Sequence, residues 1–313
     1  MEYLVGYTGF VGSNLCAKHA FDKVFRSTNI AEAYGGMPDL LVYSGVRAEM
    51  FLANQNPEAD LAVIQDAIEN IKKIAPKKLV LISTIAVYPN PKKVDETAQI
   101  HAEELTAYGR NRYFLEQWVM EHAELFPDGY LIVRLPALYG QNLKKNFIYD
   151  YIHVIPAMLT ETKINELAEQ DAIIKDYYEK QENGFYKCMA KTTEEKQLLK
   201  KYFEEAGFSA LHFTDSRSVY QFYNLAYLWE HIEKALANHI RILNLATEPI
   251  SIGELYQYLK GETFVNELPK AYFDYDYRTK HADIFGGSHG YIWDKMFVME
   301  DIKQFVSQAE KHA

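Results

Sequence analysis

A glycine-rich turn follows the first short apolar run of the chain. Gly6, Gly9 and Gly12 come directly after Tyr3-Leu4-Val5, and a helical pattern begins near Ser13. Glycines at this spacing permit a tight turn, let the backbone approach a diphosphate and leave the positive end of the helix facing its charge. The simpler alternative is an ordinary strand-to-helix turn, but its place at the start of an alternating pattern favours a dinucleotide-binding loop. The loop residues expected to contact the dinucleotide are Gly6, Thr8, Gly9, Phe10, Val11 and Gly12.

Strand-like runs alternate with helical patterns over residues 1–140. The runs are short, rich in β-branched and aromatic residues and bounded by turn residues, which is typical of strands. Strands that alternate with helices imply right-handed crossovers and a parallel sheet covered on both faces. The sequence therefore predicts an α/β fold with a doubly wound parallel sheet. Strands are expected at 3–5, 24–25, 40–43, 78–83 and 130–134, and helices at 13–21, 57–74 and 103–124.

A second, mainly helical region interrupts this pattern. Apolar residues recur at helical spacing in 152–159, 164–180 and 193–206. The alternation then resumes with an expected strand at 211–213, a helix at 218–236 and a strand at 240–245. We therefore expect a dinucleotide-binding domain over 1–143, completed by about 211–247. A smaller domain that binds the substrate is expected from 144–210 and 248–313.

Composition and charge exclude several classes of protein. The formal charge is −10, from 33 Lys and Arg against 43 Asp and Glu, and no basic run exists to bind nucleic acid. No apolar run reaches the roughly 20 residues of a membrane helix, and the start of the chain lacks the basic region of a signal peptide, so we expect a cytoplasmic protein. Cys16 and Cys188 are too few for a disulfide framework or a zinc site, and no histidine has partners at metal-ligand spacing, so no metal is expected.

The end of the second expected strand bears on the choice of dinucleotide. An acidic residue there would accept hydrogen bonds from the ribose 2′-hydroxyl of NAD, but the sequence reads Val24-Phe25-Arg26-Ser27-Thr28. Arg26 suits a 2′-phosphate, because its planar fork can bind two phosphate oxygens. We predict NADP as the preferred cofactor. The alternative is a solvated Arg26, with NAD held by Ser27 or Thr28.

A hydroxyl, a tyrosine and a cation occur at a spacing that suits hydride-transfer chemistry. Thr84 ends the fourth expected strand, and Tyr108 stands 24 residues further on, four residues before Arg112. Residues four apart share one face of a helix. Hydride transfer at a carbinol needs a group that exchanges the hydroxyl proton, a neighbour that orients the hydroxyl and a cation that lowers the pKa of a phenol. Tyr108, Thr84 and Arg112 fit these roles in that order.

Ordered motifs carry a resemblance to a known family. The chain resembles the extended short-chain dehydrogenases/reductases, the NAD(P)-dependent epimerase/dehydratase superfamily, whose members mostly modify nucleotide-linked sugars. The glycine loop matches its GxxGFxG motif and Tyr108 matches its catalytic tyrosine. Phe213-Thr214-Asp215 looks like its HVxD segment, and Leu243–Thr247 followed by Ser251–Leu255 resembles a later pair of motifs. The resemblance implies a Rossmann-type fold and further cofactor contacts at Ser27, Ser44, Gly45, Val46, Ser83, Leu135, Pro136 and Leu138.

The departures from the family pattern concern the catalytic cation and the substrate. The family motif YxxxK reads Tyr108-x-x-x-Arg112 here, so a guanidinium replaces the amine that holds the nicotinamide ribose. The arginine often found just before the HVxD segment is absent, and a diphosphate-bearing substrate then needs another cation, for which Lys144 and Lys145 are also candidates. Phe25-Arg26-Ser27 and Val87-Tyr88-Pro89 resemble the GDP-fucose synthase branch. The candidate substrate-binding residues are Arg47, Tyr88, Asn146, Arg217 and Arg278.

Three hypotheses remain open. The first is an NADP-dependent oxidoreductase or epimerase that acts on a sugar, expected to be nucleotide-linked. The second is a dinucleotide-binding sensor or assembly protein without catalysis, and the third is a reductase or lyase of a small non-nucleotide substrate. Helix 57–74 has apolar residues on two sides, and in the resembling family this helix and the Tyr108 helix build a dimer interface, so we expect a homodimer.

Overall fold

The computed structural model describes residues 1–311 and divides the chain into two units. The first unit comprises Met1–Leu143, Val219–Ser251 and Phe273–Asp301. The second comprises Lys144–Ser218, Ile252–Tyr272 and the segment from Ile302 onward. Residues 273–301 differ from expectation, since the sequence analysis assigns them to the substrate domain. They join the first unit because Tyr277 is fully buried there, with its backbone N–H donating to the Gln221 side chain at 2.9 Å.

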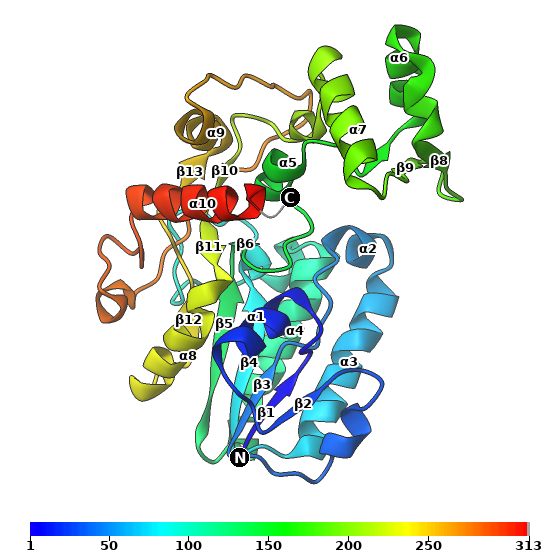
Figure 1. Cartoon of the computed structure of the whole chain (residues 1–313). Helices are drawn as coiled ribbons and strands as arrows, with labels where there is room; N and C mark the ends of the chain where they lie inside the picture. The colour runs from blue at the N-terminus through cyan, green and yellow to red at the C-terminus, as the bar shows by residue number, and fades with distance from the viewer. Residues whose placement is uncertain (312–313) are drawn as a thin grey trace. The chain divides into compact units, whose positions relative to one another are not determined.

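A six-stranded parallel sheet forms the centre of the first unit (Figure 1). Its order is β12-β5-β4-β3-β1-β2. All five strands expected before residue 140 are present, and the strand expected at 240–245 joins the sheet as β12 beside β5. The elements of this unit are β1 Glu2–Val5, α1 Phe10–Lys18, β2 Lys23–Phe25, β3 Leu40–Tyr43, α2 Met50–Gln55, α3 Pro57–Ile74, β4 Lys78–Thr84, α4 Ala107–Glu121, β5 Gly129–Leu135, β6 Ala137–Tyr139, β10 Val219–Tyr220, β11 Phe222–Asn224, α8 Leu228–Ala237, β12 Ile242–Asn244 and β13 Ile250–Ser251.

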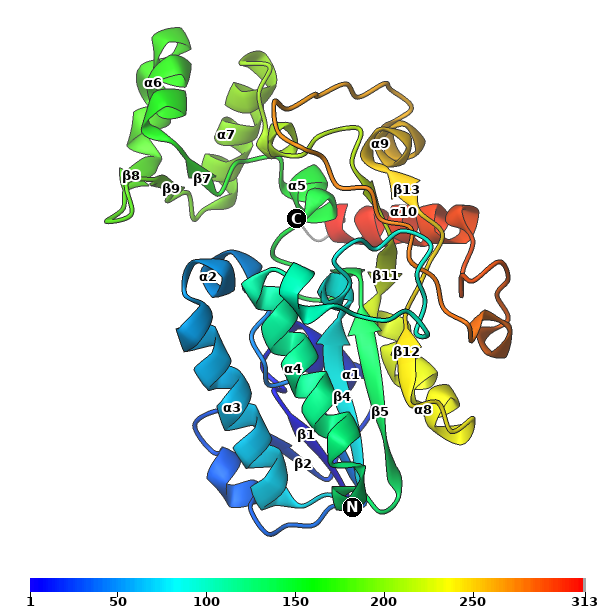
Figure 2. The same ribbon diagram turned by 180° about the vertical axis from the view of Figure 1, so that it is seen from behind.

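Helices cover both faces of this sheet. Leu4 packs with α1 and α8 in one core cluster, whereas its neighbours Tyr3 and Val5 pack with α3 and α4 in the other. Successive side chains of a strand point to opposite faces, so strands buried on both sides read as continuous apolar runs. Figure 2 shows α3 and α4 lying over one face. The doubly wound parallel fold predicted from the sequence is confirmed.

The order of the strands creates a switch point beside β1. β1 lies between β2 and β3, so the chain leaves β1 toward one side of the sheet and returns to the other. Ligands of open parallel sheets bind at such a point, outside the carboxyl ends of the strands. The two loops that flank it are the glycine loop after β1 and residues 44–47 after β3.

A buried ion pair joins α4 to β5 within the first unit. Glu116 and Arg134 have side chains 0% and 3% exposed, and the shortest of their three contacts is 2.6 Å. Ser83 donates to Glu116 at 2.5 Å, and Arg134 donates to the Tyr88 hydroxyl at 2.7 Å. Buried charges need such partners, because desolvation otherwise makes the charged form costly.

The segment expected as a helix over 218–236 is helical only in its second part. β11 pairs in parallel with β6, β10 pairs antiparallel with β13, and α8 begins at Leu228. Phe222 and Tyr223 are buried in this strand. The expected strand at 211–213 is wrong as well, because Ala210–Phe213 is a 3₁₀ turn capped by Ser209 and His212.

The second unit is mainly helical and also contains a small antiparallel sheet of order β7-β9-β8. The expected helix at 164–180 ends at Gln170, and Tyr178–Lys180 pairs with Tyr186–Cys188 as a hairpin. Asn183-Gly184 is a hairpin signal at its turn, and Gly184 has φ +81°. The elements are α5 Phe147–His153, β7 Met158–Leu159, α6 Glu161–Gln170, β8 Tyr178–Lys180, β9 Tyr186–Cys188, α7 Thr193–Glu205 and α9 Ile252–Lys260; a further helix, α10, spans Lys295–Glu310.

No helix within residues 1–311 has the length and apolar character needed to cross a membrane.

The buried ion pair generates a stability prediction. Glu116→Gln leaves Arg134 as a buried charge without a full counter-charge, so we expect the free energy of unfolding to fall by about 3–5 kcal/mol. Urea unfolding followed by circular dichroism measures the loss. Glu121→Gln, an exposed change on the same helix, is the control and should leave the curve nearly unchanged. Equal stability of the two variants would contradict a role for the pair.

Candidate functional site

The glycine loop is held by two close backbone approaches. Gly6 has φ +93°, and a Cβ there would lie 2.5 Å from the carbonyl oxygen of Ser44. A Cβ on Gly12 would lie 2.2 Å from the carbonyl oxygen of Gly6. Both positions therefore require glycine, and the first brings the loops after β1 and β3 into contact. Gly9 is different, since its nearest such contact is 3.3 Å.

Helix α1 presents its N-terminus at this loop. Gly9 is the N-cap residue, and no side chain accepts a hydrogen bond from the first turn. Backbone N–H groups at a free helix N-terminus favour an anion. Asn14, which the sequence analysis missed, ties this helix to the loop after β6: its amide donates to the Gln141 carbonyl oxygen at 2.8 Å and accepts from the Gln141 N–H at 3.0 Å.

Arg26 and Ser27 lie exposed just after β2. Asn29 shapes their turn, because its side chain accepts a hydrogen bond from the Arg26 N–H at 2.8 Å. The glycine loop is adjacent, since the Gly6 N–H donates to the Phe25 carbonyl oxygen at 2.7 Å. The Arg26 guanidinium makes no ion pair or hydrogen bond within residues 1–311, so it is free to bind an anion.

Thr84 and Tyr108 meet at the carboxyl end of β4. Thr84 ends the strand, and its hydroxyl accepts a hydrogen bond from the Ala86 N–H at 3.1 Å. Tyr108 lies in the first turn of α4, and its backbone N–H donates to the Asn54 side chain at 2.9 Å. A Cβ on Gly109 would lie 2.2 Å from the Ala86 carbonyl oxygen. Glycine at 109 therefore lets α4 rest directly on the backbone after β4, and the Thr84 hydroxyl lies close enough to Tyr108 to lower the pKa of its phenol.

Arg112 lies under the Tyr108 ring and is held by the protein itself. Its guanidinium carbon is 4.0 Å from the ring centroid, and its two terminal nitrogens donate to Asp60 and to the Arg47 carbonyl oxygen. The second contact measures 2.6 Å. Asp60, on α3, also accepts from the Asn111 amide at 2.9 Å. The sequence predicts Arg112 beside Tyr108, and the two side chains are in contact in the structure. The role of Asp60 was not predicted, because the sequence around an acidic residue on a helix does not indicate which distant residue it pairs with.

Opposing effects set the pKa of Tyr108. Burial, with the residue 6% exposed, raises the pKa of the phenol above its ordinary value. The Arg112 charge and the hydrogen bond with Thr84 lower the pKa of the phenol, whereas the Asp60 carboxylate raises it. A buried phenol with an adjacent cation is a reasonable proton-exchanging group.

Other predicted cofactor and substrate contacts lie in the first unit with their side chains already engaged. Ser83 points to the opposite face from Thr84 and donates to Glu116, as described above. Tyr88 is 4% exposed, donates to the Asp95 carbonyl oxygen at 2.9 Å and accepts from Arg134. Arg278 forms an ion pair with Asp276 at 3.7 Å. The remaining predicted contacts are Ser44, Gly45 and Val46 after β3, Leu135 at the end of β5, Pro136 next to it and Leu138 in β6.

Two predicted substrate residues lie in the second unit. Asn146 is the N-cap of α5, where its side chain accepts from the Tyr149 N–H at 3.1 Å. Arg217 is engaged by acids: it donates to Asp215 at 2.7 Å and to Glu267 at 3.0 Å. The substrate roles of both residues stay predictions. Within residues 1–311, no group of three or more His, Cys, Asp or Glu side chains is arranged to hold a metal.

Comparison with known proteins identifies one family model and many similar folds. The model of the NAD dependent epimerase/dehydratase family matches residues 24–177. No curated protein matches the sequence.

Solved structures similar to this chain include nucleotide-sugar enzymes. UDP-N-acetylglucosamine 4-epimerase from Methanobrevibacter ruminantium has a TM-score of 0.65 at 11% identity, covering 100% of this chain and 98% of that one. RMD from Pseudomonas aeruginosa, complexed with NADPH, has a TM-score of 0.62 at 14% identity. The match covers 100% of this chain and 99% of that one. dTDP-4-dehydrorhamnose reductase from Bacillus anthracis, in complex with NADP, has a TM-score of 0.61 at 15% identity. The match covers 98% of this chain and 97% of that one. At these identities the likeness shows the fold.

The close approach of α4 to the end of β4 generates the second prediction. Gly109→Ala forces a Cβ against the Ala86 carbonyl oxygen, so we expect a loss of about 1–3 kcal/mol in the free energy of unfolding. Gly253→Ala in α9 is the control, because its Cβ would meet nothing nearer than 3.4 Å. In a helix that change should be neutral or stabilising. Urea unfolding compares the two, and a stabilised Gly109→Ala variant would refute the packing argument.

Proposed function

We propose that this chain, whose residues 24–177 match the model of the NAD dependent epimerase/dehydratase family, is an NADP-dependent oxidoreductase or epimerase of a nucleotide-linked sugar. One observation carries the proposal: the Tyr108 ring covers Arg112 at the carboxyl end of β4, where the Thr84 hydroxyl lies close enough to lower the pKa of the phenol. The contact from Arg112 to the Arg47 carbonyl oxygen links this cluster to the loop after β3, which in turn touches Gly6. A proton-exchanging group therefore adjoins the expected dinucleotide loop.

The cofactor assignment rests on the residues at the switch point. Gly6 and Gly12 require glycine for their backbone approaches, the N-terminus of α1 carries no side-chain cap, and Arg26 has no acid partner among residues 1–311. These features fit a dinucleotide diphosphate and a 2′-phosphate. Similar structures hold NADPH or NADP, which supports NADP, although others in the same fold hold NAD.

The chain supplies proton transfer and positioning. A bound nicotinamide dinucleotide supplies the hydride acceptor or donor. The Tyr108 hydroxyl exchanges the proton of the reacting alcohol, and Thr84 orients that alcohol by its own hydroxyl. The Arg112 charge favours the phenolate of Tyr108, and its contacts with Asp60 and Arg47 fix the position of the guanidinium.

The substrate class is proposed from the similar structures, and the homodimer from exposed apolar residues. The similar proteins are named for UDP-linked and dTDP-linked sugars, and this supports a nucleotide-linked sugar here. The narrower likeness to the GDP-fucose synthase branch stays a prediction. Most apolar residues of α3, such as Ile64 and Ile71, are buried within the first unit. Exposed Phe51 on α2 and Phe114 on α4 are the remaining support for a dimer interface nearby.

A non-catalytic dinucleotide-binding protein is the second candidate. The donors of Arg112 are engaged by Asp60 and by the Arg47 carbonyl oxygen, so the residue is less available to hold a ribose than a free cation. Arg112→Lys separates the candidates. An enzyme tuned to arginine loses activity or shifts its pH optimum, whereas a binding protein turns over no substrate with either residue.

Tyr108→Phe tests the catalytic role. We expect turnover to fall by about 100-fold or more, because general acid–base groups contribute 10²–10⁴-fold, while affinity for NADPH stays nearly unchanged. The assay follows nicotinamide absorbance and sugar products over a panel of UDP-, dTDP- and GDP-linked sugars. Tyr113→Phe on the same helix is the matched control. Wild-type turnover in the Tyr108 variant would exclude the proposed mechanism.

Fluorescence titration with NADPH and with NADH tests the cofactor proposal. We expect NADPH to bind more tightly, and Arg26→Ala to weaken NADPH binding about tenfold or more, since hydrogen bonds to charged groups contribute about 1.5–3 kcal/mol. NADH binding should not change. Arg110→Ala, an exposed arginine of α4, is the control. Absence of binding by either nucleotide would favour a protein that kept the fold and lost the cofactor.

A further inference from the structure

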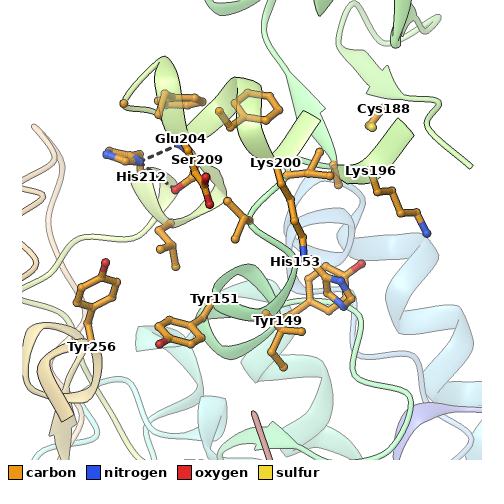
Figure 3. Close-up of a pocket in the computed structure, with 18 of the residues that line it drawn as sticks. Tyr149, Tyr151, His153, Cys188, Lys196, Lys200, Glu204, Ser209, His212 and Tyr256 are labelled. Carbon is orange, nitrogen blue, oxygen red and sulfur yellow. Dashed lines mark hydrogen bonds between the residues drawn. The ribbon is translucent and has the colours of Figure 1, made fainter. Parts of the chain in front are cut away.

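The second unit contains an open cavity of about 1230 Å³ whose lining is rich in lysines and aromatic rings. Its walls come from α5, α7, α9 and the loops beside them (Figure 3). Ligand sites typically combine apolar and aromatic walls with a few placed polar groups. None of the predicted substrate residues lines this cavity. The charged side chains and histidines in its lining are His153, Lys187, Lys196, Lys200, Glu204, His212 and Lys260.

Two lysines of α7 face this cavity without acidic partners. Lys196 and Lys200 are four residues apart and so share one face of the helix, where like charges destabilise it by a few tenths of a kcal/mol. Neither forms an ion pair within residues 1–311, even though Glu204 lies one turn beyond Lys200. The next residue shows the contrast, because Lys201 pairs with Glu205 at 3.7 Å. The unneutralised charges are thus confined to the cavity side of α7.

The charges of the two lysines act on His153 in the opposite wall of the cavity. In Figure 3, Lys200 points from α7 toward His153 on α5. Burial, and then the charges of Lys200 and Lys196, lower the pKa of His153 below its ordinary value. His153 is therefore neutral at neutral pH and adds no positive charge to that of the two lysines.

Aromatic rings line the same cavity on both sides of α5. The Tyr149 and His153 rings lie 4.1 Å apart at the lysine end, and the Tyr151 and Tyr256 rings are 5.9 Å apart (Figure 3). Tyr256 continues to Phe264 at 4.9 Å. Such rings offer stacking surface to a planar group, and lysines bind phosphate as point charges.

We propose that this cavity binds a small organic phosphate that carries an aromatic ring, with Lys196 and Lys200 holding the phosphate and the tyrosine rings packing against the ring of the ligand. The site belongs wholly to the second unit and does not depend on the proposed function, since it uses no residue of the dinucleotide loop or of the Tyr108 cluster. Like other contacts between charges near solvent, the binding should weaken as salt rises.

Binding of phenyl phosphate, inorganic phosphate and phenol to the full chain tests the proposal, by calorimetry and by saturation-transfer NMR. We expect phenyl phosphate to bind more tightly than either fragment. The double variant K196Q/K200Q should bind it about tenfold or more weakly, because two charged contacts are lost. K201Q, which removes a lysine paired on the outer side of the same helix, should bind like wild type.

Two results would overturn the proposal. One is phenyl phosphate that binds no better than phenol, and the other is a double variant that binds like wild type. Circular dichroism confirms that α7 is intact in the variant. NADPH titration of the same variant separates this site from the cofactor site, since its NADPH affinity should equal that of wild type whatever the outcome for phenyl phosphate.

Discussion

The contact between Gly109 and the Ala86 carbonyl oxygen is the constraint on which the candidate catalytic site depends. It sets how closely α4 approaches the backbone after β4, and that approach brings Tyr108 near Thr84, whose hydroxyl lowers the pKa of the phenol. The same kind of constraint holds the cofactor loop, where Gly6 and Gly12 meet carbonyl oxygens. Both halves of the site are therefore located by backbone against backbone, which is stiffer than contact between flexible side chains.

Arg112 and Asp60 act as a pair. A guanidinium has several donors in a fixed fork, so it reaches the Asp60 carboxylate and the Arg47 carbonyl oxygen while it lies under the Tyr108 ring. A lysine is a single point charge and cannot span the two acceptors in this way. Asp60 also opposes the effect of Arg112 on the pKa of Tyr108. Exchange of lysine for arginine therefore changes both the support of the tyrosine and the charge around it.

Local signals predicted much of the fold, and long-range pairing accounts for what they missed. Apolar runs with glycine turns predicted the strands of the parallel sheet and the loop after β1, because both features depend on residues that are consecutive in the sequence. Apolar spacing alone misplaced Val219–Tyr220 and Phe222–Asn224, which are strands paired with β13 and β6 respectively. The pairing of Thr84 with Tyr108 came from spacing and family resemblance, but Asp60 and the Glu116–Arg134 pair did not, since partners distant in sequence leave no local mark.

Cationic side chains that pair with carboxylates of the protein have structural roles, whereas those without an acidic partner are available to bind a ligand. Arg112, Arg134 and Arg217 all meet carboxylates, whereas Arg26, Lys196 and Lys200 have no acid partner among residues 1–311. The Arg217 guanidinium holds the pKa of the nearly buried Asp215 well below its usual range. If Arg217 turned to a phosphate, Asp215 would lose its counter-charge and its desolvation would oppose the move. Anion binding in the second unit is therefore less costly at Lys196 and Lys200 of α7, because no ion pair has to break there.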